Sequence, residues 1–247
     1  MNKLRKCIST ALITILLITV VFSGTPSIAA SMGDFTDVPE GSIYSDALNR
    51  LVTAGILSPG EKFNPDSILT REQYAKMIVA ATGNESTAEA LMGTSIFSDI
   101  DKNRWSNGYI NVAVNKGYIT GWYDGTFNPT GAVTFAQICT FFVRALGYTD
   151  IDLKGEWPSN YIAKAAELGL TDGISLDSNS GIPRWAAILM FDRLLNSKMK
   201  YGSAASGQTF IESTGNYTRC IVFGDSGIID TLTDDQVLTD KGTFRNS

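Results

Sequence analysis

The sequence contains no histidine, and this absence excludes several kinds of chemistry. Ser-His-Asp and Cys-His catalysis both use an imidazole as general base, and the usual zinc sites take ligands from histidine and cysteine. Only three cysteines are present, and their spacing indicates no disulfide framework. We therefore expect a protein that is not an enzyme, with no catalytic residues, no metal and no cofactor.

The spacing of the carboxylates argues against a twelve-residue calcium-binding loop. The segment Asp99-Ile100-Asp101 resembles the start of a calcium-binding loop. Its sixth position is Arg104 instead of glycine, and its twelfth is Ile110 instead of glutamate. A second carboxylate cluster, at Asp230, Asp234 and Asp235, is predicted to be a solvated turn.

At the N-terminus, basic residues precede an apolar run. Three cations lie within the first six residues, 8–22 is predominantly apolar, and 27–29 reads Ser-Ile-Ala. This order predicts a secretory signal peptide over 1–30. About 15 apolar residues are too few to span a bilayer core of ~30 Å comfortably, so we expect cleavage instead of a membrane anchor.

Basic charge is scarce in the remaining chain. The whole sequence has 20 Lys and Arg against 25 Asp and Glu, and loss of the three N-terminal cations leaves 17 against 25, a formal net charge of −8. Nucleic acid and anionic membranes are bound mainly through basic fields, so we expect neither as a partner. Cys7 is removed with the leader, and Cys139 and Cys220 are expected to be free thiols.

A pair of amphipathic helices recurs along the chain. In the first helix of each pair, apolar residues follow the spacing i, i+3, i+4 and end on a glycine at i+7, which predicts one buried stripe and a left-handed helix end. The three sets are Leu48, Leu51, Val52, Gly55; Ile110, Ala113, Val114, Gly117; and Ile162, Ala165, Ala166, Gly169.

The second helix of each pair repeats as closely. Counted from Thr70, Thr134 and Pro183, positions 4, 7, 8 and 11 are apolar in all three copies. Position 13 is Gly83, Gly147 or Asn196, residue types that tolerate left-handed backbone. The Thr-x-x-Gln sequences at 70–73 and 134–137 predict capping boxes.

These patterns divide the chain into repeats. We predict a signal peptide at 1–30, repeat 1 at 34–83, a linker at 84–96, repeat 2 at 97–147, a degenerate repeat 3 at 148–198, and a linker with β-like tail at 200–247. Within that tail, 209–213 and 219–223 have short β-like runs. Units of this size cannot bury a core alone, so the repeats are expected to form one body.

The motifs resemble the S-layer homology family. Repeat 2 carries Phe97-x-Asp99-Ile100, Trp105, Tyr109-Ile110, Asp124-Gly125-Thr126-Phe127-x-Pro129 and Leu146-Gly147, and repeat 1 carries Leu69-Thr70-Arg71-Glu72-Gln73. The resemblance covers 34 to about 198. It implies a mainly α fold, with three tandem repeats in a pseudo-threefold bundle, grooves between neighbours, and a short β-like or disordered C-terminal tail.

The resemblance also implies a function. Such modules hold secreted proteins non-covalently on the bacterial cell wall or cell surface by binding a secondary cell-wall polysaccharide, often one with pyruvate ketals. The partners would be that polysaccharide and a cargo domain or surface-layer proteins. Two alternatives stay open: a structural subunit of a surface lattice, or a truncated anchor of a larger secreted enzyme.

The family's groove residues carry over unevenly. In the family, the opening Asp, a nearby aromatic residue and the Arg that begins the second helix belong to the groove. The matching residues here are Asp37 and Arg71 in repeat 1, Asp99 and Trp105 in repeat 2, and Trp157 and Arg184 in repeat 3. Trp122, in a turn, is added as a candidate for sugar stacking.

No repeat has the whole set. Ile43 stands at the Trp position of repeat 1 and Phe135 at the Arg position of repeat 2, while Asp150 fits the Asp position of repeat 3 only with a shift of one residue. Because each groove is shared by neighbours, we expect one or two working grooves. Two other interpretations stay open, a solvated helix end for Arg71 and core packing for Trp105 and Trp157.

Overall fold

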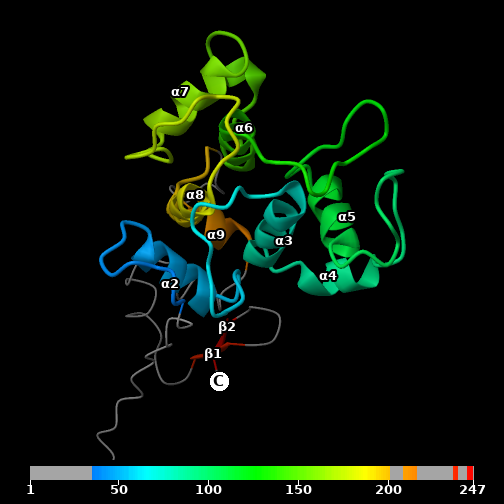
Figure 1. The fold of residues 1–247 in the computed structure, drawn as a ribbon. Coiled ribbons are helices and arrows are strands. Elements are labelled where there is room, and N and C mark those ends of the chain that lie inside the picture. The colour runs from blue at the N-terminus through cyan, green and yellow to red at the C-terminus, as the bar shows by residue number, and fades with distance from the viewer. Residues whose placement is uncertain (1–34, 201–207, 216–235, 239–243, 247) are drawn as a thin grey trace, which may run out of the picture. The chain divides into compact units, whose positions relative to one another are not determined.

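The structure is a computed structural model that describes residues 35–200, 208–215, 236–238 and 244–246. The expected signal peptide, Cys220, the run at 219–223 and the acidic cluster near 230–235 lie outside these residues. The described elements are α2 (Ser45–Thr53), α3 (Arg71–Ala81), α4 (Glu85–Ala90), α5 (Asn107–Asn115), α6 (Phe135–Ala145), η1 (Asp150–Asp152), α7 (Ser159–Glu167), α8 (Arg184–Asn196), α9 (Phe210–Ser213), β1 (Gln236–Leu238) and β2 (Phe244–Asn246) (Figure 1).

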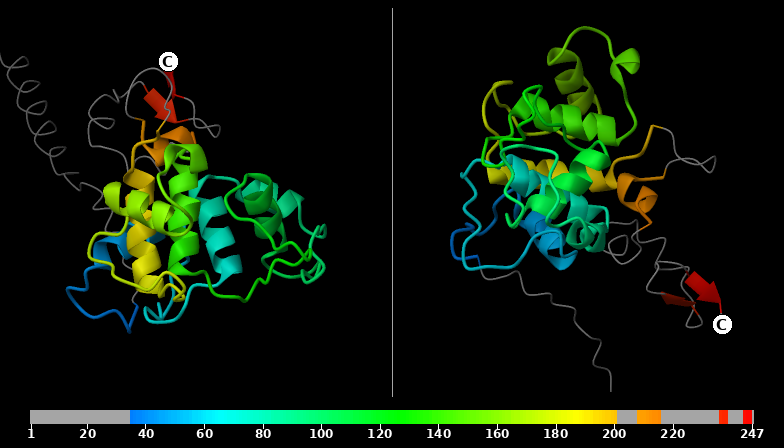
Figure 2. Two further views of the ribbon diagram at one scale, coloured as in Figure 1. Left: turned by 90° about the horizontal axis from the view of Figure 1, so that it is seen from above. Right: turned by 90° about the vertical axis from the view of Figure 1, so that its right-hand side faces the viewer.

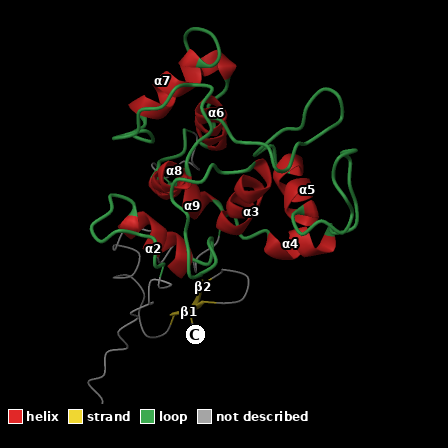
Figure 3. Ribbon diagram, in the orientation of Figure 1, coloured by secondary structure: helices red, strands yellow, loops and turns green. Residues whose placement is uncertain are grey.

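The described body is mainly α-helical, as the sequence predicts (Figure 3). Each predicted pair is present, as α2 with α3, α5 with α6, and α7 with α8. The first helices end where expected, because Gly55, Gly117 and Gly169 have φ angles of 68°, 74° and 72°. Glycine takes this left-handed conformation without a Cβ clash, so the three predicted helix ends are confirmed.

The second helices begin as predicted and end in two ways. Both capping boxes are confirmed. The hydroxyl oxygens of Thr70 and Thr134 each accept from the backbone N–H of the Gln three residues further on, and the side chain of that Gln accepts from the backbone N–H of the threonine. Gly83 and Gly147 are left-handed. The expectation for Asn196 is wrong: it is the last residue of α8, and the chain leaves through Ser197 with extended backbone.

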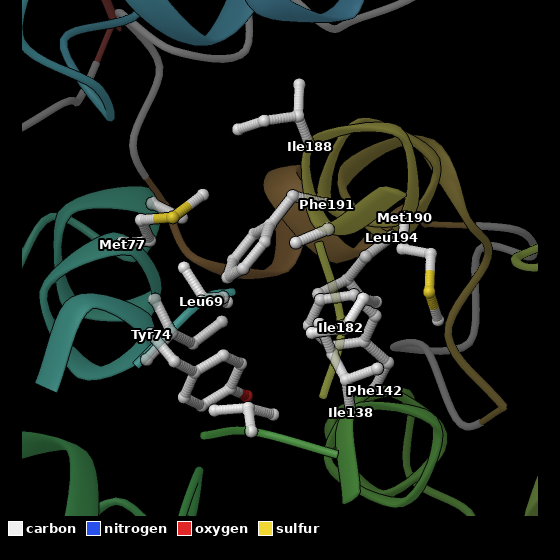
Figure 4. Close-up of a cluster of buried hydrophobic side chains, with 14 of the residues drawn as sticks. Leu69, Tyr74, Met77, Ile138, Phe142, Ile182, Ile188, Met190, Phe191 and Leu194 are labelled. Atoms are coloured by element: carbon white, nitrogen blue, oxygen red, sulfur yellow. The ribbon is translucent and has the colours of Figure 1, made fainter. Parts of the chain in front are cut away.

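The core lies where the three second helices meet. α3, α6 and α8 lie side by side (Figure 2), and each contributes a buried aromatic ring. The ring centroids of Phe142 and Phe191 are 4.9 Å apart, and Tyr74 lies 6.1 Å and 5.7 Å from them (Figure 4). Burial of such rings is a major source of folding free energy, so each pair depends on the other two for its core.

A ring of backbone hydrogen bonds relates the three repeats. The N–H of Leu69 donates to Ile182, that of Ile182 to Val133, and that of Val133 to Leu69, each at 2.9 Å. These residues occupy equivalent positions just before α3, α6 and α8. A closed cycle through equivalent positions is the signature of pseudo-threefold symmetry, and repeat 3 takes part fully.

A second ring lies next to the first and uses the residue that begins each second helix. Arg71 donates its N–H to Gly131, Phe135 to Ser180, and Arg184 to Ser67, again at 2.9 Å. Each of these helices therefore starts against the loop of a neighbouring repeat. The side chains at the three helix starts consequently lie at junctions between repeats.

Two segments outside the repeats differ from expectation. The linker 84–96 contains the helix α4, and Asn107 and Asn111 of α5 bind the backbone that follows it at Leu91, Gly93 and Thr94. Within the run 209–213, Phe210–Ser213 are helical instead of β-like, because Thr209 and Glu212 form a capping box. Thr209 itself pairs with Lys198 in an isolated β-bridge. Phe210 and Ile211 are buried in the core. Farther along, β1 and β2 pair antiparallel.

Candidate ligand-binding grooves

Three repeats contribute to one cavity of about 280 Å³, here named groove 2. Arg71 comes from repeat 1, the floor from the loop and α6 of repeat 2, and Trp157 from repeat 3. The lining residues are Arg71, Thr120, Gly121, Trp122, Tyr123, Gln137, Thr140, Phe141, Arg144 and Trp157.

A second cavity of about 250 Å³, named groove 1, is built from equivalent positions, each supplied by a different repeat than in groove 2. Arg184 comes from repeat 3, the floor from the loop and α3 of repeat 1, and Trp105 from repeat 2. Its lining residues are Ile56, Leu57, Ser58, Gln73, Lys76, Met77, Trp105 and Arg184. The structure thus brings the expected arginines and tryptophans together: Arg71 with both Trp122 and Trp157, and Arg184 with Trp105.

Arg71 is buried, so its interpretation as a solvated helix end is wrong. Its side chain reaches the loop of repeat 2, where Nε donates to the carbonyl of Phe127 at 2.7 Å and Nη2 to that of Thr120. Its guanidinium carbon lies 4.6 Å from the ring centroid of Phe127 and 5.4 Å from that of Trp122. The residue is only 2% exposed.

Burial lowers the pKa of Arg71 to about 10, and the nearby charge of Asp99 opposes this shift. The guanidinium therefore remains charged at neutral pH. Among the described residues no carboxylate lies within 4.0 Å of it. A buried cation without a close counter-ion is costly to the fold, and it is a strong site for an anionic ligand.

Arg184 repeats this arrangement in groove 1 with fewer contacts. Its Nε donates to the carbonyl of Phe63 at 2.9 Å, and its guanidinium carbon lies 5.0 Å from the Phe63 ring. It is partly buried, and burial lowers its pKa against the effect of Asp37. It too has no ion pair within the described part of the chain.

Asp37 and Asp99 hold the loops that receive these arginines. Asp37 accepts from the backbone N–H groups of Phe63 and Asn64 at 2.8 and 2.7 Å, and Asp99 accepts from Phe127 and Asn128 at 2.8 and 2.6 Å.

Both asparagines have left-handed backbone, with φ of 55° and 56°, which these bonds stabilise. The bond from Phe63 is the main cause of the lowered pKa of Asp37. Each carboxylate thus positions the Phe carbonyl to which an arginine donates.

The tryptophans at the grooves lie half in solvent. Trp105, Trp122 and Trp157 are 50%, 47% and 56% exposed, so the core interpretation of Trp105 and Trp157 is wrong. The indole N–H of Trp157 donates to the hydroxyl of Thr140 at 3.0 Å. Trp105 lies beside Tyr109, with ring centroids 6.5 Å apart. These indole faces are available to a ligand.

The equivalent third junction has a different character. Phe135 stands at the arginine position and is buried, Ala186 stands at the glutamine position, and Ile43, at the tryptophan position, is 70% exposed. Asp150 does not take the role of Asp37, because it accepts from the hydroxyl of Tyr161 at 2.6 Å and lies 3.6 Å from Arg144.

Sequence reasoning missed several groove residues. The capping boxes account for Gln73 and Gln137 without any ligand, and none of the motifs above points to Lys76, Thr140 or Tyr123. A signal was available: positions 3, 6 and 7 after the capping threonine share one helix face. Three of the groove 1 residues, Gln73, Lys76 and Met77, follow that spacing.

Comparison with known proteins finds a family match in two segments of the chain. The family model described as S-layer homology domain matches residues 34–75 and 96–139. A cell surface protein of Thermoanaerobacter kivui is 37% identical over 199 residues, covering 77% of this chain and 25% of that protein. A surface layer protein of Brevibacillus choshinensis is 30% identical over 201 residues, covering 79% and 17%.

A cellulosome-anchoring protein of Acetivibrio thermocellus is 24% identical over 152 residues, covering 56% of this chain and 34% of that protein. The chain therefore spans between 17% and 34% of the length of these relatives. In the part that the structure describes, no helix has the length and apolarity needed to cross a membrane. The family match and the relatives together indicate a secreted protein of the cell wall or cell surface, in which residues 34–75 and 96–139 match the model of the S-layer homology domain.

Proposed function

We propose that this chain anchors an exported protein non-covalently to the cell wall, by binding an anionic secondary cell-wall polysaccharide in grooves 1 and 2. One observation carries the proposal. Each groove combines an arginine that lacks an ion pair among the described residues with a half-exposed tryptophan from a neighbouring repeat. Asp37 and Asp99 serve as positioning residues for the loops.

The chemistry of the grooves suits an acidic sugar. A guanidinium binds a carboxylate, such as that of a pyruvate ketal, through paired N–H donors. An indole face packs on the apolar side of a pyranose ring. The cavities are at or below the ~300–1,000 Å³ typical of small-molecule sites, so each takes a short stretch of the polymer.

The acidic net charge of the chain does not oppose this ligand. Charges in solvent are screened over ~8 Å at physiological ionic strength. A ligand in either groove would lie next to the arginine of that groove. The dielectric constant there is lower than in bulk water, so the charge of the guanidinium acts strongly on the ligand. Local cations therefore outweigh distant carboxylates.

A sedimentation assay with purified walls tests the proposal. The chain from residue 31 to 247 is mixed with intact walls and with walls from which acid has removed the secondary polymers. We expect binding to the intact walls and loss of at least 90% of it on the stripped walls. Equal binding to both would exclude the polysaccharide as ligand.

Assembly into a surface lattice is the second candidate, because relatives are named as surface layer proteins. It predicts large assemblies of the purified chain without any wall polymer. Analytical ultracentrifugation distinguishes the two candidates, since an anchor alone stays small in solution until polysaccharide is added.

A further inference from the structure

Grooves 1 and 2 differ in how their arginines are used. Arg71 donates to two carbonyls, lies over two aromatic rings and is almost fully buried. Arg184 donates to one carbonyl and lies over one ring. Within the described residues, neither terminal amino group of Arg184 makes a hydrogen bond, so both are available to an anion.

The sequence explains this difference. From the glycine that ends the first helix to the phenylalanine of the Phe-Asn-Pro turn, the loop of repeat 2 (Gly117 to Phe127) is two residues longer than that of repeat 1 (Gly55 to Phe63). The longer loop places Trp122 over the guanidinium of Arg71. Groove 1 has no aromatic residue from its own loop in its lining.

The second cation of each groove differs as well. In groove 1, Lys76 lies 3.4 Å from the hydroxyl of Ser58, and the described residues place no carboxylate within 4.0 Å of its ammonium. In groove 2 the equivalent helix position is Thr140, which binds Trp157. The other cation there, Arg144, is already paired with Asp150.

Among the described residues, exposed aromatic side chains are more numerous in groove 2, whereas unpaired cations are more numerous in groove 1. Groove 2 is lined by Trp122, Tyr123 and Trp157, all exposed, whereas groove 1 has Trp105 alone. Asp37 raises the pKa of Arg184 and Asp99 raises the pKa of Arg71, so each groove has one carboxylate whose charge acts on its arginine. Groove 1 is thus richer in free positive charge and groove 2 in aromatic faces.

From this asymmetry, and resting on the proposed function, we propose that groove 1 selects the anionic group of the polysaccharide while groove 2 binds its sugar rings with little regard to charge. Lys76 and Arg184 are the specificity-determining residues of groove 1. Attraction to two unpaired cations depends on the ligand carboxylate and on salt, and stacking on indoles depends on neither.

Isothermal titration of the chain 31–247 tests this division. The probes are oligosaccharides released from the wall, either native or with their carboxyl groups reduced to alcohols. One variant blocks groove 2 (Trp122→Ala with Trp157→Ala), and another blocks groove 1 (Trp105→Ala with Arg184→Ala). Reduction should weaken binding at least tenfold when only groove 1 works, and less than threefold when only groove 2 works.

Single variants sharpen the assignment of Lys76. Lys76→Gln should weaken binding of the native probe about threefold to tenfold, leave the reduced probe unchanged and flatten the salt dependence. Lys76→Arg should keep most of the affinity. Lys116→Gln, an exposed lysine outside the grooves, is the matched control and should change nothing.

The outcomes separate this inference from the proposed function. If the two blocked variants respond equally to reduction, or if groove 2 alone binds neither probe, the division is wrong while anchoring stands. If the unaltered chain fails to bind native oligosaccharides, the proposed function itself fails.

Discussion

Repeats 2 and 3 contribute alike to the framework and differently to the grooves. Ile182 of repeat 3 takes its place in the central hydrogen-bond ring beside Val133 of repeat 2, and Phe191 packs against Phe142 in the core. Yet repeat 3 has Leu176, Asp177 and Ser178 where repeat 2 has Phe127, Asn128 and Pro129. The framework is satisfied by backbone bonds and apolar volume, whereas a groove needs the particular loop.

The residue type at the start of each second helix matches the loop of the neighbouring repeat that it contacts. Arg71 enters the loop of repeat 2 and Arg184 that of repeat 1, where each finds a phenylalanine carbonyl and ring. Phe135, whose helix starts against the loop of repeat 3, is apolar and buried. A loop without the Phe-Asn-Pro turn cannot surround a guanidinium, so a phenylalanine fills the third junction.

Placing an arginine at the third junction should give the largest effect. Phe135→Arg places a cation where no loop carbonyl is held ready, and a buried unpaired charge costs about 3–5 kcal/mol of the free energy of unfolding. Urea denaturation measures the loss, with Phe135→Leu as the control, expected at about 1 kcal/mol. Undiminished stability, or new wall binding, would show that the third junction is a latent groove.

Removing both arginines should abolish binding while the framework persists. Arg71→Ala with Arg184→Ala is expected to weaken wall binding at least 100-fold, or about 3 kcal/mol, because groove 1 loses its anion-binding group and groove 2 loses the guanidinium that lies over Trp122 and Phe127. Far-UV circular dichroism should report unchanged helical content. Binding that survives in the double variant would contradict the assignment of both grooves.

Loosening one loop should affect one groove and spare the other. Asp99→Asn removes one of the two acceptors that hold Phe127 and Asn128, so the carbonyl that binds Arg71 shifts. We expect a loss of about 1–2 kcal/mol in stability and a smaller loss of wall binding than in the double variant. Asp46→Asn, exposed on α2, is the matched control. If the two substitutions had equal effects, the hypothesis that Asp99 holds the loop of repeat 2 in place would be wrong.

Much of this fold could be predicted because the signals are local. Apolar spacing, capping boxes and helix-ending glycines depend on a few neighbouring residues, and their pattern gave all three helix pairs. The short helix α9 could also have been found, since Thr209 and Glu212 form a capping box. Its burial could not, because that depends on contacts of Phe210 and Ile211 with the core.

The sites were harder to predict because each is assembled across repeats. The burial of Arg71 is imposed by the loop of repeat 2, about 50 residues further along the chain. The exposure of Trp157 depends on α6, where Thr140 binds its indole. A sequence pattern identifies the residue types at these positions, and the neighbouring repeat decides how they are used.

Acid should weaken the loop of repeat 1 with the smallest effect. Hydrogen bonds from Phe63 and Asn64 lower the pKa of Asp37 below its ordinary value of 3.8. A carboxyl whose pKa is lower in the folded state stabilises the fold above its unfolded pKa, and this contribution is lost as pH falls through the folded pKa. The melting temperature of the chain should therefore fall below about pH 4, and Asp37→Asn should make that fall shallower. The exposed Asp46→Asn should leave the profile unchanged, and if it flattened the profile as much as Asp37→Asn, the effect would belong to general charge and not to the loop.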